Sequence, residues 1–366
     1  MEKKRIAILS IYDLHNFGNR LQNISVYKLL EKLNYEPETV KVDIIGRKKF
    51  IIRPILNFFN FCKIQFGDAR YQKFLEFDNN IRVSNHKVQW RLGDEIVDNK
   101  INNAYDFFIV GSDQVWNPDF AGYGFYFLDF VKDDKKKIAF SASIGVTDFS
   151  KEYAQKMELN LRTFNAISVR EQQANDIITS LTRRDDIVTL VDPTMMIESE
   201  EWSELAQKPE YFKGEKFILN YFLGELSPKR KKLIGDFADK MGYKIINILD
   251  KQDLFYASGP AEFLWLEKNA ELICTDSFHS SVFGILFNTP FLVFDREDES
   301  KNMSSRLDNL LELFELNSRK VTENKLTEKC LEIDYSKAHE KLVLEKKRGI
   351  DFLSKALEGN GKKYEV

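Results

Sequence analysis

Short apolar segments alternate with amphipathic segments along almost the whole chain. The apolar segment Arg5–Tyr12 is followed by helical spacing of apolar residues over Gly18–Leu33, and then by a second apolar segment, Val40–Ile45. Repeated strand–helix–strand units favour a mostly parallel sheet covered by helices on both faces. The sequence therefore predicts an α/β fold. In the same half of the chain we expect a helix at Glu171–Leu181 and strands at Asp106–Val110, Lys137–Ser141, Ile167–Val169 and Ile187–Val191.

The alternation stops once and then begins again. Asp192-Pro193-Thr194 ends the first set, because proline interrupts regular structure, and a second set starts at Lys216. We therefore predict two Rossmann-like doubly wound domains facing each other across a cleft. Their expected bounds are 1–195 for the N-terminal domain and 212–335 for the C-terminal domain, with 336–366 as a C-terminal helix able to cross back. In the second set we expect strands at Phe217–Phe222, Lys244–Leu249, Leu272–Cys274 and Phe291–Phe294, and helices at Pro228–Met241, Pro260–Ala270, Ser304–Leu316 and Lys337–Leu357.

The composition is that of an ordinary globular protein. The chain has 366 residues, enough for two domains, and a net charge of −3, which gives no reason to expect nucleic-acid binding. Cys62, Cys274 and Cys330 are far apart and odd in number, so they form neither a disulfide framework nor a zinc pattern. No apolar stretch has the length of a signal-peptide core or a membrane span, so we expect a cytoplasmic protein.

The segment 47–70 departs from the alternation. It combines basic residues such as Arg47 and Lys48 with aromatic residues such as Phe58 and Phe59. A basic, aromatic helix can lie on an anionic membrane surface, which would place the protein peripherally at the inner face of the membrane. An inserted helix that covers the first domain is the other interpretation, and the sequence leaves both open.

The segment Thr275–Val282 carries the strongest functional signal. It follows the apolar Leu272–Cys274 and leads into the apolar Phe283–Phe287, which predicts a strand, a tight polar turn and a helix start. Ligands of open α/β sheets bind at such turns, where the helix N-terminus favours an anion. His279 lies in this turn, and an imidazole is well suited to transferring a proton near neutral pH. The alternative is a structural histidine.

Two further strand ends carry clusters of polar residues. In the first turn, Asn16 and Asn19 either cap the helix or bind a ligand. The segment Gly111–Asn117 contains Ser112, Asp113, Gln114 and Trp116. A carboxylate can accept hydrogen bonds from two sugar hydroxyls and an indole can cover an apolar sugar face, although a hydrogen-bonded turn also explains the pattern.

Arg170 is expected where a strand ends and a helix begins. A cation is electrostatically disfavoured at a helix N-terminus, so an anionic ligand held by two hydrogen bonds explains it well. A surface ion pair is the other explanation. Nowhere do His, Asp and Glu have the spacing of metal ligands, so we predict no required metal.

In this order, the polar segments resemble the motifs of the polysaccharide pyruvyl transferase family. The matching segments are Asn16–Gln22, Gly111–Asn117, Val169–Glu171 with Asp192–Thr194, and Thr275–His279, and the similarity extends to Ser305-Arg306-Leu307. The resemblance implies a GT-B-like fold. It also implies transfer of the pyruvyl group of phosphoenolpyruvate to a sugar, commonly as a cyclic ketal across two hydroxyls, with release of phosphate. One departure is Ser280, which stands where the family usually has glycine.

The resemblance and this chemistry together assign roles to the candidate residues. His279 is the expected general acid, because the methylene carbon of phosphoenolpyruvate must be protonated. The expected partners are phosphoenolpyruvate as co-substrate and a sugar or lipid-linked oligosaccharide as acceptor, with no further cofactor. We place the acceptor on the N-terminal domain and the donor on the C-terminal domain. Donor-binding roles are expected for Arg170, Ser277, Ser280 and Arg306, and acceptor-binding roles for Asn16, Asn19, Ser112, Asp113, Gln114 and Trp116.

Two other functions are compatible with the same pattern. A nucleotide-sugar glycosyltransferase of the GT-B class would need a base-binding pocket and would leave Arg170 and His279 without a special task. A non-catalytic carbohydrate-binding or assembly protein would need neither residue. The acceptor sugar, the hydroxyls used and the oligomeric state are not indicated by the sequence.

Overall fold

The structure is a computed structural model. It describes residues 3–45, 69–91, 94–98, 100–118, 124–296, 304–322 and 325–358. The basic, aromatic segment expected at 47–70 therefore lies outside the described residues, apart from Ala69 and Arg70 at its end. The chain divides into two compact units. Unit 1 comprises the described parts of 1–67, 78–197 and 345–366, and unit 2 those of 68–77 and 198–344.

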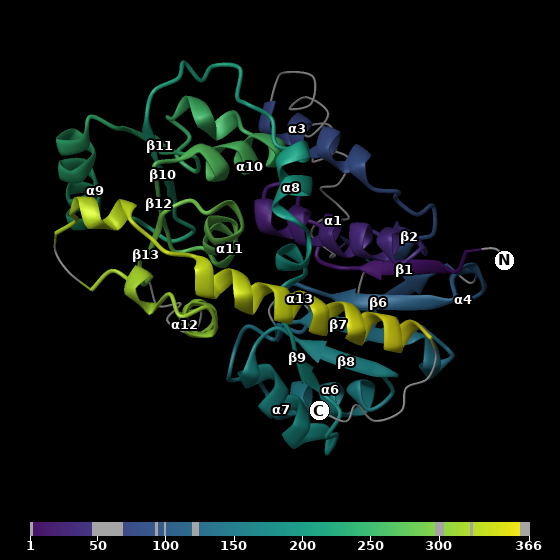
Figure 1. Cartoon of the computed structure of the whole chain (residues 1–366). Helices are drawn as coiled ribbons and strands as arrows, with labels where there is room; N and C mark the ends of the chain where they lie inside the picture. Colours follow the sequence, from purple (N-terminus) through teal and green to yellow (C-terminus); the bar gives the residue numbers. More distant parts are fainter. Residues whose placement is uncertain are drawn as a thin grey trace. The chain divides into compact units, whose positions relative to one another are not determined.

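Unit 1 contains a six-stranded sheet in which all neighbouring strands are parallel (Figure 1). The strand order is β2-β1-β6-β7-β8-β9, so the chain moves outward from β1 in both directions, as in a doubly wound fold. The strands are β1 (Arg5–Leu9), β2 (Glu36–Thr39), β6 (Phe107–Gly111), β7 (Lys137–Ala142), β8 (Ala166–Val169) and β9 (Val188–Thr189), and the helices are α1 (Phe17–Lys32), α4 (Ile101–Ala104), α6 (Lys151–Leu161) and α7 (Gln172–Thr182).

The second strand of this sheet differs from the sequence prediction. The strand beside β1 is Glu36–Thr39, whereas Val42–Ile45 forms strand β3 of a separate three-stranded sheet with β4 (Val88–Arg91) and β5 (Asp94–Val97). The sequence Glu-Pro-Glu-Thr is polar and contains Pro37, and proline is tolerated in strands at a sheet edge. Strand β2 lies at that edge, so its sequence need not be apolar.

Unit 2 contains a four-stranded parallel sheet of order β11-β10-β12-β13 (Figure 1). The chain again moves outward in both directions, here from β10. The strands are β10 (Phe217–Tyr221), β11 (Lys244–Asn247), β12 (Leu272–Thr275) and β13 (Phe291–Val293). The helices are α3 (Ala69–Phe77), α8 (Ser199–Leu205), α9 (Pro228–Met241), α10 (Pro260–Asn269), α11 (Phe278–Phe287), α12 (Ser304–Leu313) and the first part of α13 (Ser336–Leu357), whose residues from Glu345 onward belong to unit 1.

Local sequence signals explain where these elements begin and end. Helix α9 starts at Pro228 behind Ser227, whose hydroxyl accepts a hydrogen bond from the Arg230 amide, and it ends at Gly242 with φ +68°. Strands β1, β6 and β12 are buried along almost their whole length, as expected for parallel strands with helices on both faces. The predicted α/β class with two doubly wound, Rossmann-like units is therefore confirmed.

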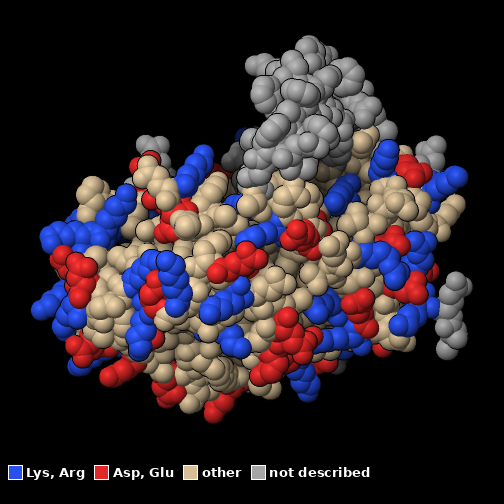
Figure 2. All heavy atoms as spheres, turned by 90° about the horizontal axis from the view of Figure 1, so that it is seen from above, with Lys and Arg blue, Asp and Glu red and all other residues tan. Residues whose placement is uncertain are grey.

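The surface is mixed in charge. On the face shown in Figure 2, Lys and Arg side chains are interspersed with Asp and Glu over the described residues, which agrees with the small net charge of −3. Among the described residues, no helix combines the length and the apolar character needed to cross a membrane.

Candidate functional site

The order of the strands in unit 1 places a topological switch point between β1 and β6. Helix α1 leaves β1 toward β2, whereas the later part of the chain returns to β6 on the other side of β1. Ligands of open α/β sheets bind at the carboxyl ends of the two strands that flank such a point. In unit 1, β1 leads into the turn that contains Asn16 at the start of α1, and β6 leads into the segment Gly111–Asn117.

The segment after β6 is tightly constrained by its neighbours. Gly111 has φ +131°, and a Cβ added there would collide with the carbonyl oxygen of Phe140 on β7, so only glycine fits. The next side chain, Ser112, is buried and donates a 2.7 Å hydrogen bond to Asp192. Asp113 follows and accepts a 2.8 Å hydrogen bond from the Gln114 amide.

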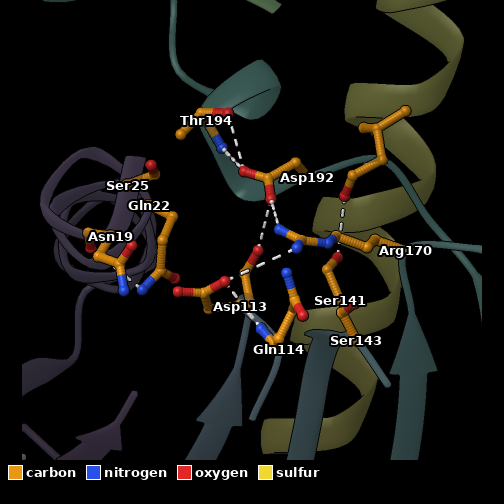
Figure 3. Close-up of polar contacts among 12 residues, drawn as sticks. Asn19, Gln22, Ser25, Asp113, Gln114, Ser141, Ser143, Arg170, Asp192 and Thr194 are labelled. Atoms are coloured by element: carbon orange, nitrogen blue, oxygen red, sulfur yellow. Dashed lines mark hydrogen bonds and ion pairs between the residues drawn. The ribbon is translucent and has the colours of Figure 1, made fainter. Parts of the chain in front are cut away.

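Arg170 connects three polar segments, Gly111–Asn117, Val169–Glu171 and Asp192–Thr194 (Figure 3). Its guanidinium lies 2.9 Å from the Asp192 carboxylate and 3.7 Å from each of the carboxylates of Asp113 and Glu171. Only 1% of the side chain is exposed. Burial lowers the pKa of Arg170, and the carboxylates, Asp192 foremost, raise it by more, so the net shift is upward.

The two flanking carboxylates organise the backbone around Arg170. Asp192 also accepts hydrogen bonds from the amide and hydroxyl of Thr194, at 3.0 and 2.8 Å. Glu171 accepts hydrogen bonds from the Ser143 hydroxyl at 2.7 Å and the Ile144 amide at 3.0 Å. The segments after β7, β8 and β9 are thereby tied to one buried cation.

The residues of α1 approach the same strand end from the other side. Asn16 caps the helix by accepting a 3.3 Å hydrogen bond from the Asn19 amide. In Figure 3, Asn19 and Gln22 project from α1 toward Asp113. Both are buried, at 6% and 0% exposure. The side-chain amides of Asn19 and Gln22 therefore lie at the switch point together with the Asp113 carboxylate. These groups are suited to the recognition of hydroxyls.

Trp116 belongs to the core and not to a sugar-binding surface. Its ring is 0% exposed, and its Nε1 donates a 3.0 Å hydrogen bond to the Tyr126 carbonyl. The ring stacks on Phe127 with a centroid separation of 6.3 Å. The expected role in covering a sugar face is corrected accordingly, because long-range packing buries the indole completely.

In unit 2 the switch point lies between β10 and β12. Asp276, directly after β12, accepts hydrogen bonds from the amides of Leu223 and Gly224, at 2.7 and 2.8 Å, and so joins the ends of the two strands. Arg296, shortly after β13, places its Nε 3.3 Å from the same carboxylate. A cation is thus held beside the turn that contains His279.

His279 is the second residue of helix α11 and is half-buried. Its neighbour Ser277 is the N-cap residue, yet in the part of the chain that the structure describes the Ser277 side chain makes no capping hydrogen bond. The first turn of α11 carries no acidic residue. The arrangement leaves the positive end of the helix dipole beside the imidazole without a side-chain cap, as at anion-binding helix N-termini.

Ser280 points away from this turn and into the interior. Its hydroxyl donates a 2.6 Å hydrogen bond to Glu267 on α10, and both residues are fully buried. We therefore correct the expected contact of Ser280 with the donor phosphate. Arg306 lies in α12 and is half-buried.

Comparison with known proteins gives the family. Residues 16–298 match the family model described as polysaccharide pyruvyl transferase. The chain belongs to the polysaccharide pyruvyl transferase family. A search of curated proteins found no match. Membership makes the protein a transferase of pyruvyl groups and implies a polysaccharide acceptor.

Solved structures also match the chain, at low sequence identity. The UDP-GlcNAc 2-epimerase from Neisseria meningitidis is 13% identical, with a TM-score of 0.46 over 96% of this chain and 100% of that one. The corresponding enzyme from Methanocaldococcus jannaschii is 14% identical, with a TM-score of 0.46 over 93% and 91%. The glycosyltransferase SnogD from Streptomyces nogalater is 11% identical, with a TM-score of 0.39 over 98% of each chain.

The structure groups the predicted site residues of this pyruvyl transferase by unit. Asn16, Asn19, Ser112, Asp113, Gln114, Trp116 and Arg170 belong to unit 1, whereas Ser277, His279, Ser280 and Arg306 belong to unit 2. Arg170 was expected to hold a donor anion, but its charge is taken up by three carboxylates of unit 1. We correct its role to that of a buried residue that organises the segments after β6, β8 and β9. Within the described residues, no group of three His, Cys, Asp or Glu side chains is arranged to hold a metal ion.

Three charged residues that lie near these switch points were not identified from the sequence. They are Arg20 in the first turn of α1, Glu267 in α10 and Arg296 after β13. Arg20 carried a usable signal, since it is a cation in the first turn of a helix, the argument already applied to Arg170. Glu267 and Arg296 carried none, because each is a single charged residue in an ordinary sequence context.

Proposed function

We propose that this protein transfers the pyruvyl group of phosphoenolpyruvate to hydroxyls of a sugar in a surface polysaccharide or in its lipid-linked precursor. Family membership supports pyruvyl transfer in general. The observation that carries the finer proposal is the position of His279, in the first turn of α11 at the switch point of unit 2. A proton donor and an anion-binding helix end are both needed for an enol phosphate, and here they coincide.

The proposed reaction balances without an oxidant or a reductant. The imidazolium of His279 gives a proton to the methylene carbon of phosphoenolpyruvate, which leaves an oxocarbenium-like centre at the adjacent carbon. A sugar hydroxyl attacks that carbon and loses its proton. Phosphate then leaves, and a second hydroxyl of the same sugar closes the ketal and loses its proton. One proton enters at carbon, two leave from oxygen, and the products are the ketal and phosphate.

The donor side of the proposal rests on unit 2. The Ser277 hydroxyl and the first amides of α11 suit the phosphate, since the first turn of α11 has no acidic residue and, in the described residues, Ser277 makes no side-chain cap. Arg296 replaces Arg170 as the cation assigned to the donor, because it lies beside the same turn through Asp276. Arg306 remains a second candidate for the donor carboxylate.

The acceptor side rests on unit 1. Asn16, Asn19, Asp113 and Gln114 lie at or beside the carboxyl ends of β1 and β6 and suit the orientation of sugar hydroxyls. Ser112 supports them indirectly, because its hydroxyl is committed to Asp192. Arg170 fixes Asp113 in place.

The test is to incubate the protein with phosphoenolpyruvate and a panel of simple and undecaprenyl-linked glycosides. The expected result is phosphate release together with one product whose mass exceeds that of its acceptor by pyruvic acid less one water. Thermal stabilisation by phosphoenolpyruvate and not by nucleotide sugars is expected as well. Stabilisation by nucleotide sugars alone, with no phosphate released on any acceptor, would instead indicate a glycosyltransferase.

A further inference from the structure

Arg20 is a buried cation at the switch point of unit 1. It belongs to the first turn of α1, where the helix dipole disfavours a positive charge and where no acidic residue is present. Only 1% of its side chain is exposed. Burial lowers the pKa of Arg20 to about 10, even though Asp13 and Asp113 act in the opposite direction. The site therefore holds a charge that its own residues stabilise only in part.

The contacts of Arg20 leave one edge of its guanidinium unused. Nη1 donates to Asp78 at 3.1 Å, and the guanidinium lies 3.7 Å from the centroid of the Tyr12 ring. Nε and Nη2 are both buried and have no hydrogen-bond partner within the described residues. The hydrogens of these two nitrogens lie on one edge of the guanidinium, the edge that binds two oxygens of a single phosphate or carboxylate. Leaving such donors unpaired in the interior is costly.

A second cation lies close to the first. Nζ of Lys41 is 4.1 Å from the Tyr12 ring centroid and 3.9 Å from the Asp78 carboxylate. Burial and, next, the charge of Arg20 lower the pKa of Lys41. Asp78 is thus shared by two cations, and the Tyr12 hydroxyl donates to it as well. Asp113, the next carboxylate, is already paired with Arg170.

We propose that the open edge of Arg20, assisted by Lys41, binds an oxyanion carried by the acceptor sugar, either a phosphate or a carboxylate. This inference rests on the proposed acceptor side of unit 1. It names the substrate class more closely, as a charged glycoside and not a neutral one. The hydroxyls to be modified lie near Asp113, and the oxyanion anchors the same sugar at the start of α1. The Tyr12 ring, which contacts both cations, holds them in place.

The test compares matched glycosides by calorimetric titration in the absence of phosphoenolpyruvate. The probes are the 1-phosphates of glucose and galactose, the methyl glycosides of the same two sugars, and the methyl glycosides of glucuronic and galacturonic acid, whose carboxylates are free. For the wild type we expect tighter binding of one charged form than of the matching methyl glycoside. Preference for the phosphate or for the uronide then identifies the source of the oxyanion. Equal binding of charged and neutral forms would overturn the inference.

Two variants locate the site. Arg20→Lys keeps the charge but loses the paired donors, so binding of the charged glycoside should weaken roughly 10- to 100-fold. Lys41→Gln, at a side chain that is 42% exposed, should weaken it several-fold without risk to folding. Lys244→Gln, at an exposed lysine of unit 2, is the matched control and should change nothing. Charged binding that survives both unit 1 variants would also overturn the inference.

Turnover separates this inference from the proposed function. If charged glycosides bind through Arg20 but phosphate is never released from phosphoenolpyruvate, the anion site is supported and the proposed reaction is wrong. If pyruvyl transfer occurs with the same KM for neutral and charged acceptors, and Arg20→Lys changes neither KM, the reaction is supported and the anion site is wrong.

Discussion

The Ser280 hydroxyl donates a 2.6 Å hydrogen bond to Oε1 of Glu267, and neither side chain reaches solvent. Burial raises the pKa of the Glu267 carboxyl well above its usual value, and the hydrogen bond from Ser280 offsets this only in part. Ser280 thus gives a buried carboxyl a hydrogen-bond partner. Ser280 and Glu267 are best regarded as one structural pair beneath the His279 turn.

The pair predicts a specific pH dependence of stability. The unfolded chain releases the Glu267 proton above pH 4.5, whereas the folded protein retains it to a higher pH. Unfolding is therefore accompanied by proton release in this window, and Glu267 makes the fold less stable as the pH rises. Glu267→Gln keeps an acceptor for Ser280 but cannot ionise. By urea unfolding it should be at least as stable as the wild type at pH 7, with the advantage disappearing as the pH falls toward 4.5.

A matched variant tests the hydrogen bond itself. Glu267→Leu leaves the Ser280 hydroxyl buried without its acceptor and should cost about 1–3 kcal/mol. A wild type that gains stability over Glu267→Gln as the pH rises would contradict the interpretation, since it would mean that Glu267 is ionised and paired in the fold.

The ion pairs of Arg170 predict a large loss of stability on removal of the cation. Arg170→Met leaves Asp192, Asp113 and Glu171 without their common counter-ion in a buried site, so unfolding in urea should require about 3–5 kcal/mol less. Arg162→Met is the control, because Arg162 pairs with Glu158 at the surface and should contribute less than about 1 kcal/mol. Similar small losses in both variants would show that the cluster is not the organiser we infer.

The fold was largely predictable because its parallel strands are buried. Segments such as Ile6–Leu9 and Leu272–Cys274 must be apolar when helices cover both faces of a sheet, so hydrophobicity alone locates them. The same reasoning fails for the edge strand Glu36–Thr39, which is polar because one side has no neighbouring strand. It fails also for the sheet of β3, β4 and β5, in which β3 pairs with β4 across a long separation in sequence.

The sequence predicted that the candidate residues lie at strand ends, but it did not predict the contacts of each side chain. The polar motifs were expected at strand ends, and the structure has them after β1, β6, β8, β9 and β12, because topology brings the carboxyl ends of neighbouring parallel strands together. Whether a polar side chain there faces a ligand or the interior depends on packing from distant segments. Ser280 faces Glu267, and Trp116 is enclosed by Phe127 and Phe164. No local pattern distinguishes such residues from ligand-binding ones.

Asp276 predicts a local, measurable change in the backbone of unit 2. Its carboxylate accepts hydrogen bonds from the amides of Leu223 and Gly224 and pairs with Arg296. In Asp276→Ala those two amides should lose protection in hydrogen exchange, and the KM for phosphoenolpyruvate should rise because Arg296 is no longer held at the turn. Asp250→Ala removes an exposed carboxylate that accepts a hydrogen bond from the nearby Gln252 amide, and it should leave both readouts unchanged. Unchanged protection in Asp276→Ala would contradict the bridging role.

His279 supplies the most direct test of the proposed chemistry. His279→Gln keeps a polar side chain of similar size at the second position of α11 but removes the proton donor, so turnover should fall roughly 10²- to 10⁴-fold with little change in thermal stability. His86→Gln is the matched control, because His86 has a structural partner in Asp98, at 2.8 Å, beside the small sheet of unit 1. Its loss should leave pyruvyl transfer intact. If His279→Gln retained full activity, another group would have to donate the proton, and the family assignment would hold without the general acid that we propose.

A general acid also affects the pH profile, since its acidic form must be present for turnover. The alkaline fall in kcat/KM should therefore disappear from the residual activity of His279→Gln but not from the activity of His86→Gln.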